Sequence, residues 1–237
     1  MQLFYNPNIS ETTGEISFDK DESRHIVKVL RMGIGDIMKI SNGKGSFFDA
    51  EIVLASPKEC IAKILNEEKV DPLPYYLHLA VAPTKLNDRY EWFLEKATEI
   101  GISEITPIIC DHSERKIIKT ERYEKIILSA MKQSLKAHLP ILNEAISFKN
   151  FIDSEKDNDG IRCIAHCEET QKKSLKAVLE PNKKITLLIG PEGDFSADEI
   201  DLAIRSGFLP VTLGESRLRT ETAAVVACHS VAFINQD

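Results

Sequence analysis

The sequence predicts an α/β protein of two domains, and three observations support this. Residues 1–70 contain short β-like runs broken by turns, whereas apolar strand-like runs alternate with helical stretches after residue 74. Such alternation is typical of a parallel sheet covered by helices. Between the two regions, Pro72 and Pro74 interrupt both helix and strand, which indicates a linker. We therefore expect a β-rich domain at 1–70 and an α/β domain at 74–237.

The first domain is predicted to be a small β-barrel with one helix. Apolar runs indicate strands at 37–40, 47–53 and 61–65. Asn42 and Gly43 stand between the first two runs, and an Asn-Gly pair favours a tight hairpin turn whose central residues have positive φ. The segment 22–30 has helical spacing, with Ile26, Val27 and Leu30 on one side.

The second domain is predicted to contain five strands and five helices. The expected strands cover 77–82, 105–109, 162–165, 185–189 and 209–213, and the expected helices cover 89–100, 121–137, 172–179, 197–206 and 222–234. Ser196 and Glu199 have the spacing of a capping box, which places a helix start there. Gly101 and Gly207 stand where a glycine commonly follows a helix. Residues 148–160 are polar and are expected to form a loop or a short helix.

Composition and charge restrict the class of protein. The 237 residues are 43% hydrophobic and 28% charged, which is ordinary for a globular chain that buries a core without disulfides. We find neither an apolar run of the about 18 residues that span a bilayer nor the pattern of a signal peptide. We therefore expect a cytoplasmic protein with free cysteines. The net charge of −7 excludes a uniformly basic surface but leaves room for a local basic patch.

Three loops that follow predicted strands form the candidate ligand site. Ligands of open α/β sheets bind at the carboxyl ends of the strands, and the three loops begin near His166, Gly190 and Gly214. A glycine directly after a strand lets the backbone approach a ligand closely, so backbone groups could recognise an adenine and a ribose. A turn without ligand is the alternative. Neither a Walker A motif nor GxGxxG is present, which leaves a phosphate-binding loop unsupported.

The last loop leads directly into an apolar terminal helix. Thr220 is expected to cap this helix and Glu221 to lie in its first turn, and a ligand-binding role is compatible with both. The helix is apolar on much of its surface, so we expect burial, partly against a second subunit. His166 lies near Cys163 and Cys167, but a metal site needs three or four converging ligands, and we expect no metal.

Basic residues are unevenly distributed along the chain. Residues 112–139 carry seven Lys or Arg against three Glu, a net charge of +4, whereas residues 190–237 carry a net charge of −5. The basic stretch could line an RNA groove or could be a solvated helix face. Arg24, Lys28 and Arg31, at spacings of four and three, are expected to share one helix face.

Several motifs, in this order along the chain, resemble one family. They are HIVKVLR at 25–31, KLNDRYEWFLEKATEIG at 85–101, the Gln-Ser pair at 133–134, GPEGDF at 190–195 and LGESRLRTETA at 213–223. This set is similar to the signatures of ribosomal RNA small subunit methyltransferase E, a family of SPOUT-class RNA methyltransferases that use S-adenosylmethionine. The resemblance spans nearly the whole chain, and the ordered set is far more specific than any single motif.

The resemblance implies a fold, a reaction and a partner. It implies an N-terminal PUA-like β-barrel that helps bind RNA, and a SPOUT α/β domain with a deep trefoil knot, although knots are rare in general. It further implies a homodimer with the active site near the subunit interface. The implied reaction is methylation of N3 of one uridine, uridine 1498, in the decoding region of 16S ribosomal RNA.

The resemblance also implies roles for individual residues. Those implied to bind the cofactor are Ala165, His166, Ile189, Gly190, Pro191, Glu192, Gly193, Leu213, Gly214, Leu218, Arg219, Thr220, Thr222 and Ala223. Those implied to contact RNA are Arg24, Lys28, Arg31, Lys85, Arg89, Arg115, Lys132 and Lys136. Four positions depart from the family pattern. Asp194 stands where Gly is more frequent and is tolerated if φ is positive, Ser216-Arg217 differs from the usual pair, and Lys136 replaces a frequent Arg.

The implied chemistry requires the proton on uracil N3 to leave. A carboxylate could accept it, or cationic donors could stabilise negative charge on the carbonyl oxygens of the base. Glu192 and Glu221 are candidates for the first role and Arg219 for the second, and the sequence leaves the choice open. A duplex shields N3, so the target uridine must be unpaired or flipped.

Two other functions compete with this hypothesis. A related SPOUT enzyme could act on another RNA, for example on a ribose 2′-oxygen, but the motifs at 25–31 and 85–101 favour the uridine-N3 enzymes. A non-catalytic RNA-binding module for ribosome assembly is the other alternative. The intact cofactor loops argue against it, because RNA binding alone does not require them.

Overall fold

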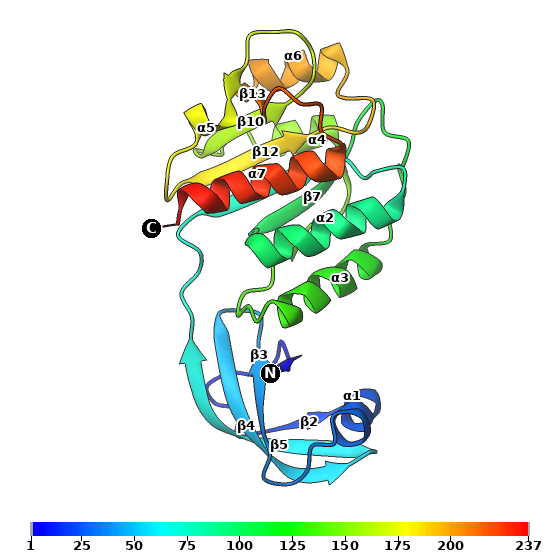
Figure 1. Ribbon diagram of the computed structural model, residues 1–237, viewed down its shortest axis with the longest axis vertical. Helices are drawn as coiled ribbons and strands as arrows, with labels where there is room; N and C mark the ends of the chain where they lie inside the picture. The colour runs from blue at the N-terminus through cyan, green and yellow to red at the C-terminus, as the bar shows by residue number, and fades with distance from the viewer. Residues whose placement is uncertain (1, 237) are drawn as a thin grey trace. The chain divides into compact units, whose positions relative to one another are not determined.

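The structure is a computed structural model that describes residues 2–236, and these form two compact units (Figure 1). The first comprises the chain up to Pro72 together with Met131–Leu139, and the second comprises Leu73–Ala130 and the chain from Pro140 onward. The sequence analysis placed Met131–Leu139 in the second domain. This segment belongs to the first unit because its backbone bonds to a hairpin loop there, with Gly45 N donating to Ala137 O at 3.0 Å.

The first unit is a curled five-stranded sheet, and α1 follows its strand β2 along the chain (Figure 1). Its elements are β1 (Leu3–Tyr5), β2 (Glu15–Phe18), α1 (Lys20–Arg24), β3 (Ile37–Ser41), β4 (Ser46–Ser56) and β5 (Glu59–Lys69). The strand order is β1-β3-β4-β5-β2, and only β1 and β3 pair in parallel. Two register shifts between β4 and β5 bend the long hairpin around a core that includes Phe4, Ile26, Ile40, Phe48 and Ile52. The predicted strands are present, and β1 and β2 are additional.

The helix expected at 22–30 is not one regular helix. Helix α1 ends at Arg24, and His25–Val29 continue as a π-helical turn. Arg31 then adopts a left-handed backbone conformation with φ of 57°. The expectation that Arg24, Lys28 and Arg31 share one helix face is therefore wrong, because the wider π-helical turn changes the angle between successive side chains. Ile26 is nevertheless fully buried and Val27 and Leu30 pack on the core, as the spacing predicts.

The hairpin at Asn42-Gly43 is present, but its turn differs from the predicted type. Positive φ occurs at Gly43 and Gly45, not at Asn42. The side chain of Asn42 organises the loop instead, because its Oδ1 accepts from the backbone amides of Lys44 and Ser46 at 2.8 and 3.1 Å. An asparagine side chain thereby replaces a backbone acceptor.

The second unit is a parallel sheet with helices on both faces (Figure 1). Its strands are β6 (Tyr76–Val81), β7 (Glu104–Ile109), β8 (Ile141–Leu142), β9 (Ile146–Ser147), β10 (Ile161–Ala165), β11 (Lys173–Ser174), β12 (Lys184–Ile189) and β13 (Leu209–Thr212). The order is β11-β13-β10-β12-β6-β7-β8, with β9 also paired to β7, and every pair is parallel. All five predicted strands are confirmed, whereas the two-residue strands β8, β9 and β11 give no periodic signal.

Helices pack on alternating side chains of these strands. They are α2 (Asn87–Ile100), α3 (Thr120–Gln133), α4 (Phe148–Ser154), α5 (Leu175–Val178), α6 (Ala197–Arg205) and α7 (Thr220–Ile234). Ala80 of β6 and Ala82, which directly follows this strand, share one core cluster with residues of α4 and α6. On the other side, α2 and α7 pack together and α7 also contacts β6 and β12. The α/β class predicted from the alternation is therefore confirmed. The trefoil knot stays a prediction.

Three helix boundaries differ from expectation. The helix expected at 172–179 shrinks to α5, because Glu180 precedes Pro181 and Leu179 is already extended, with ψ of 138°. Helix α3 ends at Gln133, since Leu135 is left-handed, with φ of 53°. The cap of α7 is Arg219 rather than Thr220. The capping box of Ser196 and Glu199 is present as predicted.

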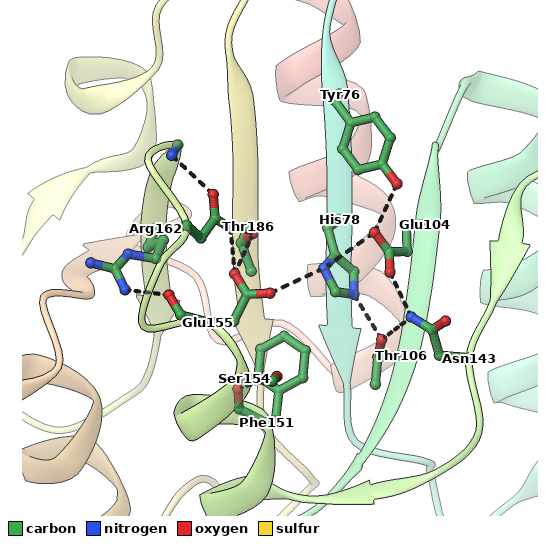
Figure 2. Close-up of polar contacts among 12 residues, drawn as sticks. Tyr76, His78, Glu104, Thr106, Asn143, Phe151, Ser154, Glu155, Arg162 and Thr186 are labelled. Carbon is green, nitrogen blue, oxygen red and sulfur yellow. Dashed lines mark hydrogen bonds and ion pairs between the residues drawn. The ribbon is translucent and has the colours of Figure 1, made fainter.

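A buried polar network lies within the core between the sheet and α4. Figure 2 shows His78 of β6 between Glu104 of β7 and Glu155, which directly follows α4; its Nδ1 lies 3.6 and 3.7 Å from their carboxylate oxygens. The other ring nitrogen lies 2.7 Å from Oγ1 of Thr106. Burial lowers the pKa of His78, although the two carboxylates oppose this shift. The network thus holds a histidine that favours its neutral form.

Candidate active site

Two adjoining cavities lie where β10, β12 and β13 end, with volumes of about 450 and 240 Å³. The larger is lined by Ala165, His166, Cys167, Lys172, Ile189, Val211, Thr212, Leu213, Gly214, Glu215, Ser216, Arg217, Leu218 and Ala223. The smaller is lined by Ala165, Cys167, Ile189, Gly190, Pro191, Glu192, Asp194, Arg217, Leu218, Arg219, Thr220 and Ala223. The two share six residues, so we treat them together as the loop pocket. Its size suits a small-molecule ligand.

The loop pocket contains most of the residues that the sequence pointed to. Of the predicted cofactor-binding residues, only Gly193 and Thr222 are absent from its lining. The lining residues that the sequence analysis missed are Cys167, Lys172, Asp194, Val211, Thr212, Glu215, Ser216 and Arg217. These residues lie at or just after the ends of the same three strands. A prediction that took every residue of the three loops, and not only the motif positions, would have found most of them.

His166 is a buried polar residue in the wall of the loop pocket. Its side chain is 6% exposed, and within the described residues neither Nδ1 nor Nε2 has a hydrogen-bond partner. Burial lowers the pKa of this imidazole, and nearby Lys172 acts in the same direction. Buried polar groups are normally paired. The two ring nitrogens therefore fit a ligand that supplies a donor or an acceptor.

Glycines give the loops their shape, each for a different reason. Gly214 has φ of 137°, and a Cβ at this position would meet no atom within 4 Å, so the backbone faces open space. Gly190 lies against the ring of Phe195, and a Cβ added to this glycine would be only 3.1 Å from two carbon atoms of the ring. Its carbonyl accepts a hydrogen bond of 3.0 Å from Oγ1 of Thr220, which ties the second loop to the start of α7. The hydroxyl expected to cap α7 thus stabilises the pocket instead.

Asp194 connects two of the loops. Its backbone is left-handed, with φ of 63°, which an aspartate tolerates. Oδ2 accepts from the amide of Cys167 at 2.6 Å, and Oδ1 accepts from the amide of Phe195 at 2.9 Å. The departure from the glycine that is frequent in the family therefore supplies two hydrogen bonds.

Two carboxylates beside the loop pocket have unpaired, buried oxygens. Oε1 of Glu192 accepts from the backbone amide of Lys85 at 2.9 Å, and Oε1 of Glu221 lies 3.8 Å from Nε of Arg89. The Oε2 atom of each carboxylate has no partner within residues 2–236. Glu192 lines the pocket, whereas Glu221 does not. The two candidates for proton acceptor are thus distinguished by their access to the pocket.

The predicted RNA-binding residues fall into two groups. Lys85, Arg89 and Arg115 lie in the second unit near the two carboxylates, and Arg115 donates to the carbonyls of Thr84 and Lys85 at 3.0 and 2.8 Å. The others lie in the first unit: Arg24, Lys28, Arg31, Lys132 and Lys136. There the π-helical turn and the left-handed Arg31 stand out, since such irregularities occur frequently at functional sites.

Two searches give negative results for the described part of the chain. No group of three or more His, Cys, Asp or Glu side chains is arranged to hold a metal ion. None of the helices is long and apolar enough to cross a bilayer. The five cysteines are all free, and only Cys167 is exposed.

Comparison with known proteins agrees with this geometry. The sequence model of one protein family, described as an RNA methyltransferase domain, matches residues 71–232. The model of a second family, described as an RNA methyltransferase PUA domain, matches residues 18–65. The ribosomal RNA small subunit methyltransferase E of Buchnera aphidicola (subspecies Acyrthosiphon pisum) is 37% identical, over 89% of this chain and 85% of that protein. The chain belongs to the ribosomal RNA small subunit methyltransferase E family.

Solved structures support the same assignment. A probable rRNA methyltransferase from Porphyromonas gingivalis is 42% identical and superposes with a TM-score of 0.91, covering 99% of this chain and 98% of that one. The methyltransferase E from Neisseria gonorrhoeae, in a crystal structure bound to S-adenosylmethionine, is 25% identical with a TM-score of 0.85 at the same coverage. The expected PUA-like domain and the expected α/β domain with a parallel sheet are therefore confirmed.

Proposed function

We propose that this protein transfers the methyl group of S-adenosylmethionine to N3 of a uridine in 16S ribosomal RNA, and that the target is uridine 1498. The observation that carries the proposal is the loop pocket, which combines the buried, unpartnered His166 with the carboxylate of Glu192. Membership in the family supports the reaction class. The same reasoning favours action in the bacterial cytoplasm, where ribosomes are assembled.

The residues of the pocket fit S-adenosylmethionine. The open space in front of Gly214 and the unpartnered nitrogens of His166 suit a ligand with many polar atoms. Apolar side chains such as Ile189, Val211 and Leu218 suit the faces of an adenine. When bound, the cofactor supplies an electrophilic methyl group on a sulfonium. Because that group is already reactive, the protein mainly has to align the nucleophile.

We assign acceptance of the N3 proton to Glu192. Its Oε1 is fixed by the amide of Lys85, so the free Oε2 has a defined position at the pocket wall. A carboxylate in a partly buried position can take a proton during the reaction. Glu221 lies outside the pocket lining and 3.8 Å from Arg89, so we assign it to positioning this arginine. Arg219, which lines the pocket and is exposed, stabilises negative charge on the uracil oxygens.

RNA binding is assigned to both units. In the second unit, the backbone amide of Lys85 donates to Glu192, Arg115 donates to the carbonyl of Lys85, and Arg89 lies beside Glu221. We assign these three cations to the phosphates next to the target. In the first unit, Arg24, Lys28, Arg31, Lys132 and Lys136 are proposed to contact further phosphates of the RNA. A homodimer is proposed as well, because Phe233 on α7 is an exposed aromatic side chain on a helix that is otherwise largely apolar.

Mapping of methylated uridines in 16S RNA tests the function. RNA from cells with and without the gene is digested, and the fragments are analysed by mass spectrometry. We expect one N3-methyluridine to disappear in the deletion strain and to return with the wild-type gene but not with Glu192→Gln. Loss of a ribose methyl group would favour the alternative SPOUT chemistry. An unchanged pattern, together with defective subunit assembly, would favour the non-catalytic module.

A further inference from the structure

Ile117 is the most exposed large apolar side chain in the described residues, with 83% of its surface accessible. It lies in the segment 111–119 between β7 and α3, which we name the finger loop. Isolated apolar residues on a surface need no explanation. Here, however, hydrogen bonds hold one end of the loop in place, and basic residues stand on both sides of Ile117 in the sequence. These two features suggest that the exposed side chain has a function.

The base of the finger loop is hydrogen-bonded to the loop after β12 and to the first turn of α6. The amide of Asp111 donates to Oε1 of Glu199 at 3.0 Å, and Oδ2 of Asp111 accepts from Oγ of Ser196 at 2.6 Å. Nδ1 of His112 lies 3.0 Å from the carbonyl of Gly193. These bonds join the finger loop to the same segment that carries Glu192. The loop is therefore placed relative to the reaction site by direct contacts.

Arg115 provides a second anchor closer to the tip. Its guanidinium donates to the carbonyls of Thr84 and Lys85, and the amide of Lys85 in turn donates to Glu192. Ile117 follows Arg115 by two residues, a span of at most about 7 Å along the backbone. The tip is therefore tied, through one side chain and one peptide, to the proposed proton acceptor.

The charges around the tip suit a nucleic acid. Lys116 and Lys119 are exposed, and in the described part of the chain neither forms an ion pair. Such lysines suit the phosphates of a nucleic-acid backbone. Proteins that bend or open nucleic acids insert Ile, Leu or Phe between stacked bases. Ile117 is such an aliphatic side chain, and the lysines on either side of it could bind the phosphates that flank the bases.

We propose that Ile117 is a wedge that enters the RNA beside the target uridine and fills the space that the base leaves when it moves into the active site. The inference rests on the proposed function, because N3 of a stacked or paired uridine is shielded and the base must leave its stack to react. The two lysines hold the flanking backbone while the side chain separates the neighbouring bases. Ile117 is thus a positioning residue and takes no part in proton or methyl transfer.

Fluorescence of a neighbouring base tests the wedge. The probe is a synthetic RNA hairpin of the decoding region with 2-aminopurine next to the target uridine, because this base brightens when it loses its stacking partner. At saturating wild-type protein we expect a several-fold rise in fluorescence. Ile117→Ala should lose most of this rise, and Ile117→Leu, which keeps the aliphatic bulk, should retain it. Ile204→Ala is the matched control, since Ile204 is an exposed isoleucine on α6.

Methylation of small ribosomal subunits separates this inference from the proposed function. With subunits from a strain that lacks the modification, Ile117→Ala should lower the single-turnover rate about tenfold, while calorimetric affinity for S-adenosylmethionine stays unchanged. A wild-type protein that methylates no uridine would contradict the proposed function itself. An active wild type whose fluorescence rise and rate both survive Ile117→Ala would overturn the wedge alone. A change of oligomeric state in Ile117→Ala would also overturn it, since a second copy would then cover this side chain.

Discussion

Oδ2 of Asp194 accepts a hydrogen bond of 2.6 Å from the backbone amide of Cys167, and this bond joins the loop after β12 to the loop after β10. Both loops line the pocket proposed for the cofactor. The second carboxylate oxygen accepts from Phe195, so a single side chain stabilises its own loop and fastens it to another. The geometry of the pocket therefore depends on a residue that need not touch the reacting atoms.

Replacement of Asp194 should weaken cofactor binding without unfolding the protein. Asp194→Ala removes both bonds and leaves a non-glycine residue at φ of 63°, so we expect a loss of roughly 1–3 kcal/mol in the free energy of unfolding. We expect about tenfold weaker binding of S-adenosylmethionine in calorimetry. Asparagine at this position keeps one acceptor oxygen and tolerates a positive φ. The affinity of Asp194→Asn for S-adenosylmethionine should therefore lie between those of wild type and Asp194→Ala. Equal affinities for wild type and Asp194→Ala would show that the bond is dispensable.

Arg31 and Arg219 should affect different steps. Arg31→Ala removes a cation from the first unit, so RNA affinity should fall by roughly 1–3 kcal/mol, with a smaller salt dependence and unchanged cofactor affinity. Arg219→Ala should lower the methylation rate at saturating RNA. RNA binding at two salt concentrations and single-turnover kinetics distinguish the two. Lys58→Ala, at an exposed turn of the first unit, serves as the control for a general loss of charge. The assignment is wrong if Arg31→Ala binds RNA normally.

Stability should fall in mildly acidic solution because of His78. Burial lowers its pKa in the folded state below the ordinary value of 6.5, so the unfolded chain binds more protons in the interval between the two pKa values. The free energy of unfolding therefore decreases as the pH falls through this interval, by at most about 1.4 kcal/mol per pH unit for one proton. Urea titrations between pH 5 and pH 8 measure this slope.

Two variants test whether His78 causes the slope. His78 faces Glu104, Glu155, Thr106 and the ring of Phe151, and Lys184 also acts on its charge. His78→Gln should be less stable at pH 8 and should have a shallower slope. His166→Gln should remove a second contribution of the same sign, because burial lowers that pKa as well. A wild-type stability that is constant from pH 8 to pH 5 would contradict the assignment.

Helix α7 should contribute to a dimer interface. Phe233 is 63% exposed, although α7 is otherwise largely apolar and packs on α2, β6 and β12. We expect a dimer in light scattering at micromolar concentration, and Phe233→Asp should shift it towards monomer. Ile204→Asp, on α6, is the control for adding a charge to an exposed apolar position. A wild-type protein that is monomeric at these concentrations would refute the dimer.

The sequence predicted features that depend on neighbouring residues. The capping box at Ser196 and the loop that begins at Gly190 are local patterns, and both are present. The five predicted strands of the second unit are runs of mostly apolar residues, so their composition was sufficient to find them. The one predicted cap that failed was Thr220, whose hydroxyl bonds to Gly190, a partner thirty residues away along the chain.

Features that depend on distant residues could not be predicted. The bond between Asp194 and Cys167 joins two loops, and the network of His78, Glu104 and Glu155 joins two strands and a helix end. Nothing in the spacing of these residues reveals that they meet. The two-residue strands are equally silent, because a strand of this length shows no period. The sequence of the finger loop gives no local signal either, because the loop is positioned by hydrogen bonds to residues that are distant along the chain.

Glu192 should be required for transfer but not for cofactor binding. Glu192→Gln keeps the shape of the side chain and the acceptor for the amide of Lys85, but removes the basic carboxylate. We expect a loss of about 10²- to 10⁴-fold in the single-turnover rate, the usual contribution of a general base. Calorimetric affinity for S-adenosylmethionine should be unchanged. Glu180→Gln, on an exposed loop, controls for the loss of one negative charge.

The most direct measurement is the position of a labelled methyl group after reaction with purified protein. Small subunits that lack the modification are incubated with wild-type protein and S-adenosylmethionine carrying a deuterated methyl group, and the 16S RNA is digested to nucleosides and fragments for mass spectrometry. Our account predicts one labelled N3-methyluridine in the decoding region, and none with Glu192→Gln. A label on a ribose oxygen, on another base, or at wild-type level with Glu192→Gln would contradict it.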